Sequence, residues 1–187
     1  KVLGSLPPSV AAPKYEHSDL SPGILHFGVG NFHRAHQAVY LDDLFCSGRD
    51  HDWALVGAGV LPSDEAMREK LGAQDWLTTV VEQDSDHMAA RVTAPMVGFV
   101  TAANPQTLLS RLADPAIRIV SLTITEGGYF IDPASGKFDP AHPAIAADGA
   151  DIAHPKTVFG FIVAGLMRRK AAGTKPFTIM SCDNIPG

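Results

Sequence analysis

The sequence predicts an α/β fold, a doubly wound and mainly parallel sheet with helices on both faces. Short apolar runs rich in β-branched residues alternate along the chain with segments of helical periodicity. Clusters of Gly, Pro and Asp separate most of these segments. In addition, an apolar run over residues 24–27 meets a Gly-x-Gly turn and then a helical pattern at once, which is typical of a β-turn-α unit.

The first half of the chain follows this alternation in order. Residues 1–20 carry Pro7, Pro8 and Pro13 and predict an irregular N-terminal arm. Ser63 is expected as the N-cap of a helix with Asp64 in its first turn. The elements expected here are strand 24–27, helix 32–45, strand 53–60, helix 63–71 and a strand over 77–82.

The second half of the chain is expected to complete the sheet. The stretch 91–100 predicts one strand that pairs with 77–82 in a hairpin-like excursion. Between residues 129 and 155, Pro, Gly and Asp predict an extended loop. The other expected elements are helix 106–112, strand 117–123, helix 156–170 and strand 177–181. Residues 21–187 are thus predicted to form one dinucleotide-binding domain of the Rossmann type.

Composition excludes several classes of protein. A length of 187 residues suits one domain, and a net charge of −5 argues against a nucleic-acid partner. No apolar run reaches the roughly 18 residues that a membrane-spanning helix needs. The two cysteines, Cys46 and Cys182, are too few and too far apart for a disulfide framework, which favours a cytoplasmic location.

The glycine turn indicates a dinucleotide site. Gly28 would allow a sharp turn, and Gly30 would let the backbone approach a pyrophosphate at the start of the following helix. The backbone N–H groups of Asn31 and Phe32 would then contact the phosphates. His33 occupies the place of the usual third glycine. The alternative interpretation is a structural turn without a ligand.

Three segments carry a more specific similarity. Residues 28–37 (GVGNFHRAHQ), 121–129 (SLTITEGGY) and 181–184 (SCDN) resemble the signatures of the long-chain, zinc-independent polyol dehydrogenases. The resemblance implies hydride transfer between NAD and a sugar alcohol or ketose, of the D-mannitol and D-fructose type, or a hexuronate. It also implies a helical C-terminal domain that supplies a catalytic lysine and is absent from this chain, so residues 1–187 alone are expected to be inactive.

Four further residues are candidates for the site. Asp64 follows the second strand, where an acid would bind the adenosine ribose and disfavour NADP; it could equally serve only the helix dipole. Thr123 and Thr125, at a strand end, would bond the nicotinamide ribose or serve merely as strand and turn residues. The resemblance implies that Asn184 helps to hold the substrate oxygen; otherwise it forms an Asx turn.

Other functions stay open at this point. His33 and His36 lie three residues apart, but no third ligand is near in sequence, so no metal site is expected. An S-adenosylmethionine-dependent methyltransferase also has a Gly-x-Gly turn after its first strand. A non-catalytic NAD-binding module would fit the same sequence.

Overall fold

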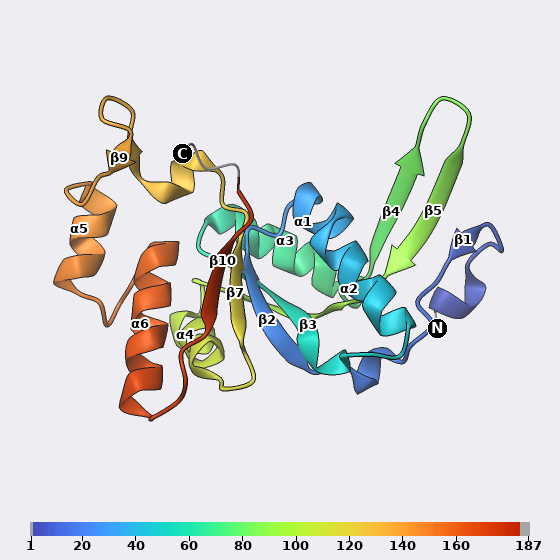
Figure 1. Cartoon of the computed structure of the whole chain (residues 1–187), viewed down its shortest axis with the longest axis horizontal. Helices are drawn as coiled ribbons and strands as arrows, with labels where there is room; N and C mark the ends of the chain where they lie inside the picture. Colours follow the sequence, from blue (N-terminus) through green and yellow to red (C-terminus); the bar gives the residue numbers. More distant parts are fainter. Residues whose placement is uncertain (1, 184–187) are drawn as a thin grey trace.

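A five-stranded, entirely parallel sheet forms the centre of the computed structural model, which describes residues 2–183 (Figure 1). Its strand order is β10-β7-β2-β3-β6, and every neighbouring pair is parallel. The order reverses between β2 and β7, the switch point at which doubly wound sheets bind ligands. The predicted fold class is confirmed. The strands are β2 Pro22–Phe27, β3 Ala54–Gly59, β6 Met96–Thr101, β7 Ile119–Leu122 and β10 Thr178–Ser181.

Alternate residues of the strands face two hydrophobic cores. Leu25 and Phe27 of β2 lie in the core formed with α4 and α6, whereas Ile24 lies in the core with α2 and α3. Burial of each such side chain contributes about 1.5–3 kcal/mol. The helices are α1 Asn31–Ala35, α2 Gln37–Cys46, α3 Pro62–Gly72, α4 Pro105–Ala113 and α6 Val158–Ala171.

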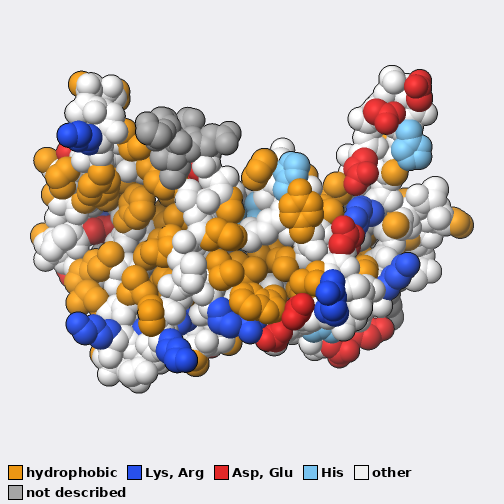
Figure 2. Space-filling view, in the orientation of Figure 1, with side chains coloured by type: hydrophobic (Ala, Val, Ile, Leu, Met, Phe, Trp, Pro, Cys, Tyr) orange, Lys and Arg blue, Asp and Glu red, His pale blue; other side chains and the backbone are white. Residues whose placement is uncertain are grey.

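A second, smaller sheet projects from the body (Figure 1). The hairpin of β4, Thr78–Gln83, and β5, Met88–Thr93, is antiparallel, and β1, Val10–Ala11, pairs with β5 in parallel. Figure 2 shows acidic side chains gathered near the hairpin tip. The residues predicted as an irregular arm thus include a strand and two 3₁₀ turns, Val2–Ser5 and His17–Asp19.

One buried carboxylate fastens the small sheet to the body. Asp42 of α2 is 2% exposed and accepts hydrogen bonds from Tyr15 Oη at 2.7 Å, Arg91 Nη2 at 2.6 Å and Ala94 N at 3.1 Å. Its negative charge is therefore fully paired, as a buried charge requires. The N-terminal segment, the hairpin and α2 meet at this residue.

Several predicted boundaries were wrong. The stretch 91–100 is two strands in different sheets, because Pro95 follows Ala94 and cannot donate to a ladder. The helix over 32–45 is interrupted at His36, whose backbone has φ −124° and ψ −81°. Helix α3 begins at Pro62 with Leu61 as its N-cap, not at Ser63, since proline is well suited to the first helical position.

The long loop predicted over 129–155 also contains regular structure. A short hairpin, β8 Ile131–Asp132 and β9 Lys137–Phe138, is followed by helix α5, Pro143–Ala150. Proline at its first position and four alanines in eight residues favour this helix, and these outweigh the Gly and Asp that suggested a loop. Helix α5 lies beside α6 (Figure 1).

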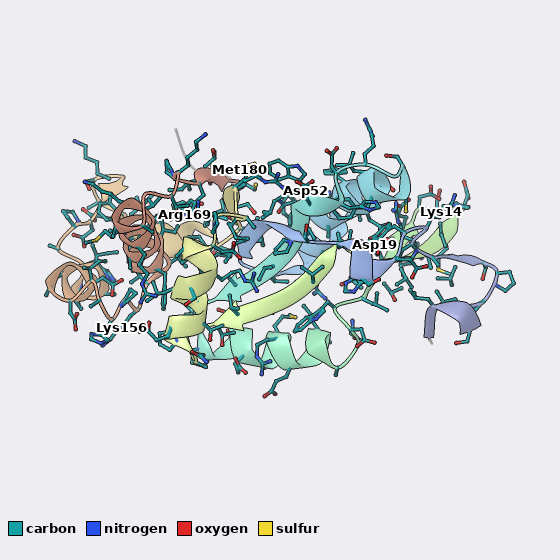
Figure 3. The ribbon with its side chains drawn as sticks, turned by 90° about the horizontal axis from the view of Figure 1, so that it is seen from below. Lys14, Asp19, Asp52, Lys156, Arg169 and Met180 are labelled. Carbon is teal, nitrogen blue, oxygen red and sulfur yellow. The ribbon has the colours of Figure 1, made fainter. Side chains whose placement is uncertain are left out.

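A buried arginine side chain holds the last turn of α6 in place. Arg169, labelled in Figure 3, is 2% exposed, and its guanidinium donates to the carbonyls of Leu112, Asp114, Ile117 and Lys175 at 2.5–2.8 Å. Burial lowers the pKa of this arginine. These bonds satisfy carbonyls at the end of α4 and in the loops that lead into β7 and β10, opposite to the edge that carries the candidate site.

Candidate cofactor-binding site

The turn after β2 can accept only glycine at its first position. Gly28 has φ +95°, and a Cβ atom there would lie 2.0 Å from the carbonyl oxygen of Thr123. The turn is closed by a bond from Gly30 N to Gly28 O of 2.7 Å, and Gly30 is the N-cap of α1. The first N–H groups of a helix have no partner within it, so those of Asn31 and Phe32 are available to a ligand.

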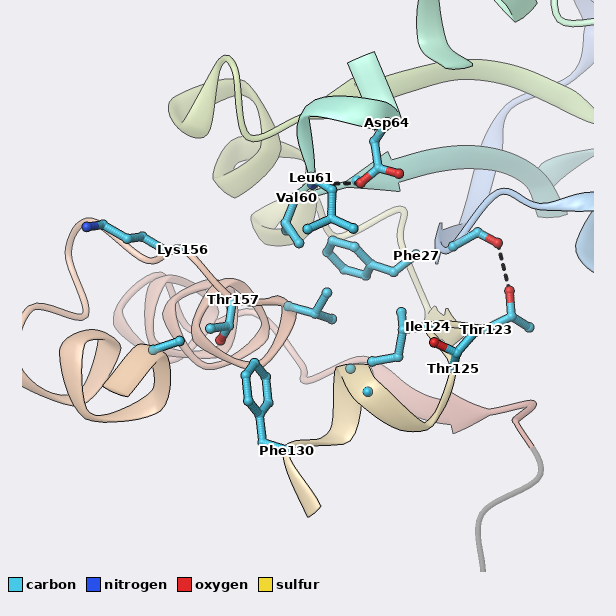
Figure 4. Close-up of a pocket in the computed structure, with 16 residues that line it drawn as sticks. Phe27, Val60, Leu61, Asp64, Thr123, Ile124, Thr125, Phe130, Lys156 and Thr157 are labelled. Carbon is cyan, nitrogen blue, oxygen red and sulfur yellow. Dashed lines mark hydrogen bonds between the residues drawn. The ribbon is translucent and has the colours of Figure 1, made fainter. Parts of the chain in front are cut away.

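A cleft of about 590 Å³ opens beside this turn (Figure 4). Its volume lies within the range of about 300–1,000 Å³ that is typical of small-molecule sites. The lining includes four of the predicted residues, Gly28, Asp64, Thr123 and Thr125. The other lining residues are Phe27, Gly59, Val60, Leu61, Ile124, Gly127, Gly128, Phe130, Ala144, Lys156, Thr157 and Val158.

Asp64 both caps a helix and lines the cleft. Its Oδ2 accepts the backbone N–H of Leu61 at 2.8 Å, so it caps the start of α3. It also lines the cleft next to Gly59, where a Cβ would lie 2.2 Å from the Asp64 Cβ. A glycine at the end of β3 therefore lets the carboxylate approach the strand, and helix capping does not remove it from the cleft.

The hydroxyl of Thr123 is engaged within the protein. It donates to Gly28 O at 2.7 Å and lies 2.9 Å from His26 Nε2, while His26 Nδ1 lies 2.8 Å from Ser121 Oγ. These bonds join the glycine turn to the end of β7 across the switch point. Thr123 thus lines the cleft while its hydroxyl supports the turn.

A stacked histidine pair, which no periodic pattern predicted, lies under the turn. The rings of His26 and His33 are 3.7 Å apart between centroids and 16° from parallel, and both residues are buried. Among the side chains that the structure describes, neither ring nitrogen of His33 has a hydrogen-bond partner. Burial lowers the pKa of His26 to about 4 and the pKa of His33 well below its usual value.

The remaining predicted site residues are Asn31, Phe32 and Asn184. Phe32 is 58% exposed, and the Asn31 side chain accepts from Arg34 Nη2 at 2.6 Å. Asn184 lies outside the described residues. Within residues 2–183, no group of three or more described His, Cys, Asp or Glu side chains is arranged to hold a metal ion.

Sequence reasoning missed the opposite wall of the cleft. Thr157 is the N-cap of α6, and its Oγ1 accepts from Gly160 N at 3.0 Å while donating to Asp148 Oδ2 at 2.6 Å. The neighbouring Lys156 is exposed and contributes a positive charge to the rim. A threonine directly before an apolar helical pattern was the available signal.

The comparison with known families decides the assignment. Residues 22–187 match the family model described as the mannitol dehydrogenase Rossmann domain. The chain belongs to the mannitol dehydrogenase family.

Relatives in this family share both sequence and structure with the chain. It is 59% identical over 180 residues to a mannitol 2-dehydrogenase of Cereibacter sphaeroides, covering 96% of this chain and 38% of that protein. It is 46% identical to a polyol:NADP oxidoreductase of Gluconobacter oxydans, covering 99% of this chain and 39% of that one.

The solved structure of Pseudomonas fluorescens mannitol 2-dehydrogenase, a ternary complex with NAD and D-mannitol, superposes with a TM-score of 0.93. Its sequence identity is 48%, and the match covers 97% of this chain and 37% of that one. The chain therefore spans less than two fifths of the length of these relatives. No helix among the described residues is long and apolar enough to cross a bilayer.

Proposed function

We propose that residues 1–187 bind NAD and form the cofactor-binding part of an enzyme that transfers a hydride between a polyol and a ketose, of the D-mannitol and D-fructose type. The observation that carries this proposal is the position of the cleft. It adjoins the Gly28 turn at the switch point of a parallel sheet, and the family match covers both.

The residues of the cleft fit the parts of a dinucleotide. The pyrophosphate would lie at the Gly28–Gly30 turn, against the N–H groups of Asn31 and Phe32. The adenosine ribose would lie near Asp64, and the nicotinamide end near Thr125. NAD would supply the hydride acceptor when bound, and the residues of this chain would hold and orient it.

The Asp64 carboxylate supports a preference for NAD over NADP. A 2′-phosphate at the adenosine ribose would lie close to a like charge and be disfavoured. Relatives of the chain include one named for NADP and one solved with NAD, so cofactor choice varies within the family.

Catalysis is proposed to need a further part of the polypeptide. The family resemblance assigns the proton transfer to a lysine of a helical C-terminal domain, with Asn184 helping to hold the substrate oxygen. Without a general base beside the polyol hydroxyl and without a cover over the crevice, the acid–base step and the water-free geometry are both lost.

The test compares purified residues 1–187 with the complete polypeptide. We expect calorimetric titration to detect NAD binding by residues 1–187, and a spectrophotometric assay with mannitol and NAD to detect no turnover above background. The complete polypeptide should oxidise mannitol, and a panel with fructuronate and mannonate separates a hexuronate reductase. Turnover by residues 1–187 at a comparable rate would show that the chemistry was placed wrongly. Absence of NAD binding and of turnover by either protein would overturn the proposal.

A further inference from the structure

Two segments that lie far apart in sequence meet at the carboxylate of Asp183. Its Oδ2 accepts the backbone N–H of Ile124 at 2.9 Å and the hydroxyl of Tyr129 at 2.8 Å, and its Oδ1 accepts the N–H of Thr125 at 3.2 Å. The same Tyr129 hydroxyl lies 2.7 Å from Ser181 Oγ. One side chain at the end of β10 thus fixes the chain that leaves β7.

The backbone that Asp183 holds is strained. Thr125 has φ +63° and ψ 168°, a conformation that a β-branched residue rarely adopts. Such a conformation persists only where surrounding contacts impose it. The bonds from Ile124 N and Thr125 N to the carboxylate act on the backbone before the Thr125 Cα, and Gly128 N donates to the Thr125 carbonyl at 3.0 Å on its other side.

Thr125 is part of the cleft, whereas Asp183 is not among its lining residues. In Figure 4, the Thr125 side chain lies near Thr123, at the end of the cleft that adjoins the Gly28 turn. The strained peptide therefore determines where the side chain of Thr125 stands relative to the cofactor.

We propose that Asp183 is a positioning residue for hydride transfer, which acts by holding Thr125 in the conformation that aligns the nicotinamide half of the cofactor. This inference rests on the proposed function. Asp183 is not a general base, because both of its oxygens already accept hydrogen bonds, three in all. Burial and the Asp183 carboxylate together raise the pKa of the Tyr129 hydroxyl to about 12, which agrees with its hydrogen bond to that carboxylate.

The decisive variant is Asp183→Asn in the complete polypeptide. The amide keeps the size of the side chain but has one acceptor oxygen, so its NH₂ group faces the backbone N–H of either Thr125 or Ile124. We expect kcat for mannitol oxidation to fall about 10- to 100-fold, because small misplacements of reacting groups cost that much. The primary isotope effect with carbinol-deuterated mannitol should rise, since hydride transfer becomes slower. Affinity for ADP-ribose, which lacks nicotinamide, should change less than about twofold.

Two companion variants separate positioning from stability. Asp114→Asn is the matched control, because Asp114 also accepts a backbone N–H, from Ala116 at 2.9 Å, but at the opposite end of β7. It should lower the melting temperature without changing kcat or the isotope effect. Tyr129→Phe removes one of the three bonds to Asp183 and keeps both backbone bonds, so its loss of kcat should be smaller but in the same direction.

A double-mutant cycle tests the route through Thr125. If Asp183 acts through that peptide, the losses caused by Asp183→Asn and Thr125→Gly will not multiply. Independent, multiplying losses would overturn the proposal, as would an Asp183→Asn enzyme with unchanged kcat and isotope effect. If Asp183→Asn does not fold, an unchanged kcat and isotope effect in Tyr129→Phe would count against the proposal. Failure of the wild-type polypeptide to oxidise any polyol with NAD would instead refute the proposed function.

Discussion

The buried histidine pair predicts that the domain loses stability between pH 7 and pH 5. His26 is fully buried, and burial lowers its pKa from the usual 6.5 to about 4. The unfolded chain therefore binds a proton below pH 6.5 that the folded chain does not accept until about pH 4, so stability falls as the pH falls through this window.

The size of the effect follows from the shift. The difference between the usual pKa of 6.5 and about 4 in the folded chain corresponds to about 3 kcal/mol when it is fully expressed, of which about 2 kcal/mol is lost by pH 5. His33 adds in the same direction, because its pKa is lowered too. Domains are stable by only about 5–15 kcal/mol, so the loss should be plain in urea unfolding at the two pH values.

His33→Phe is the variant that tests the cause. Phenylalanine can keep the ring stack on His26 but cannot take up a proton, so the difference in unfolding free energy between pH 7 and pH 5 should shrink. His87→Phe makes the same change at an exposed position of the hairpin and should leave the difference as it is. Equal wild-type stability at both pH values would refute the reasoning, and so would an undiminished difference in His33→Phe.

Three other predictions concern the cofactor and metal. Gly28→Ala should weaken NAD binding at least about tenfold and lower the melting temperature, because its Cβ meets the Thr123 carbonyl. Gly48→Ala is the control: Gly48 has φ +76° but open space around it, so the fall in melting temperature reports the cost of the backbone conformation alone. Asp64→Ala should reduce the difference in binding free energy between NAD and NADP by about 1–3 kcal/mol in calorimetric titrations. An unchanged ratio of the two dissociation constants would show that Asp64 is only a helix cap. Polyol oxidation by the complete polypeptide should survive prolonged EDTA treatment; a loss that zinc reverses would contradict this.

The order of strands and helices could be predicted from the sequence because it depends on local patterns. The Gly28 turn is an example, since an apolar run, two glycines and a helical period all lie within a few residues. Pro95 was a local signal for the break after Ala94, but the joining of β5 and β6 to different sheets depends on pairing with distant strands. Helix α5 was not predicted, because its Pro, Asp and Gly residues are also common in turns, whereas proline at the first position of a helix favours the helix.

The candidate site was only partly predictable for a similar reason. Gly28 could be named because its left-handed conformation depends on local backbone geometry. The role of Asp183 depends on a partner strand and on a loop more than 50 residues away. The stack of His26 on His33 likewise joins a strand to a helix across the turn. Contacts of this kind leave no periodic trace in the sequence.

The attachment of the small sheet at Asp42 has a consequence for how the molecule opens. Its hairpin exposes Val81 and Met88, so it buries little apolar surface of its own, while the parallel sheet retains two cores. Opening of the strands β1, β4 and β5 therefore requires the release of the Asp42 cluster and exposure of a few buried residues such as Val92, whereas opening of the parallel sheet requires exposure of a core. The amides of the hairpin should exchange with solvent as one early cooperative unit, and the cofactor cleft should keep its shape while they do so.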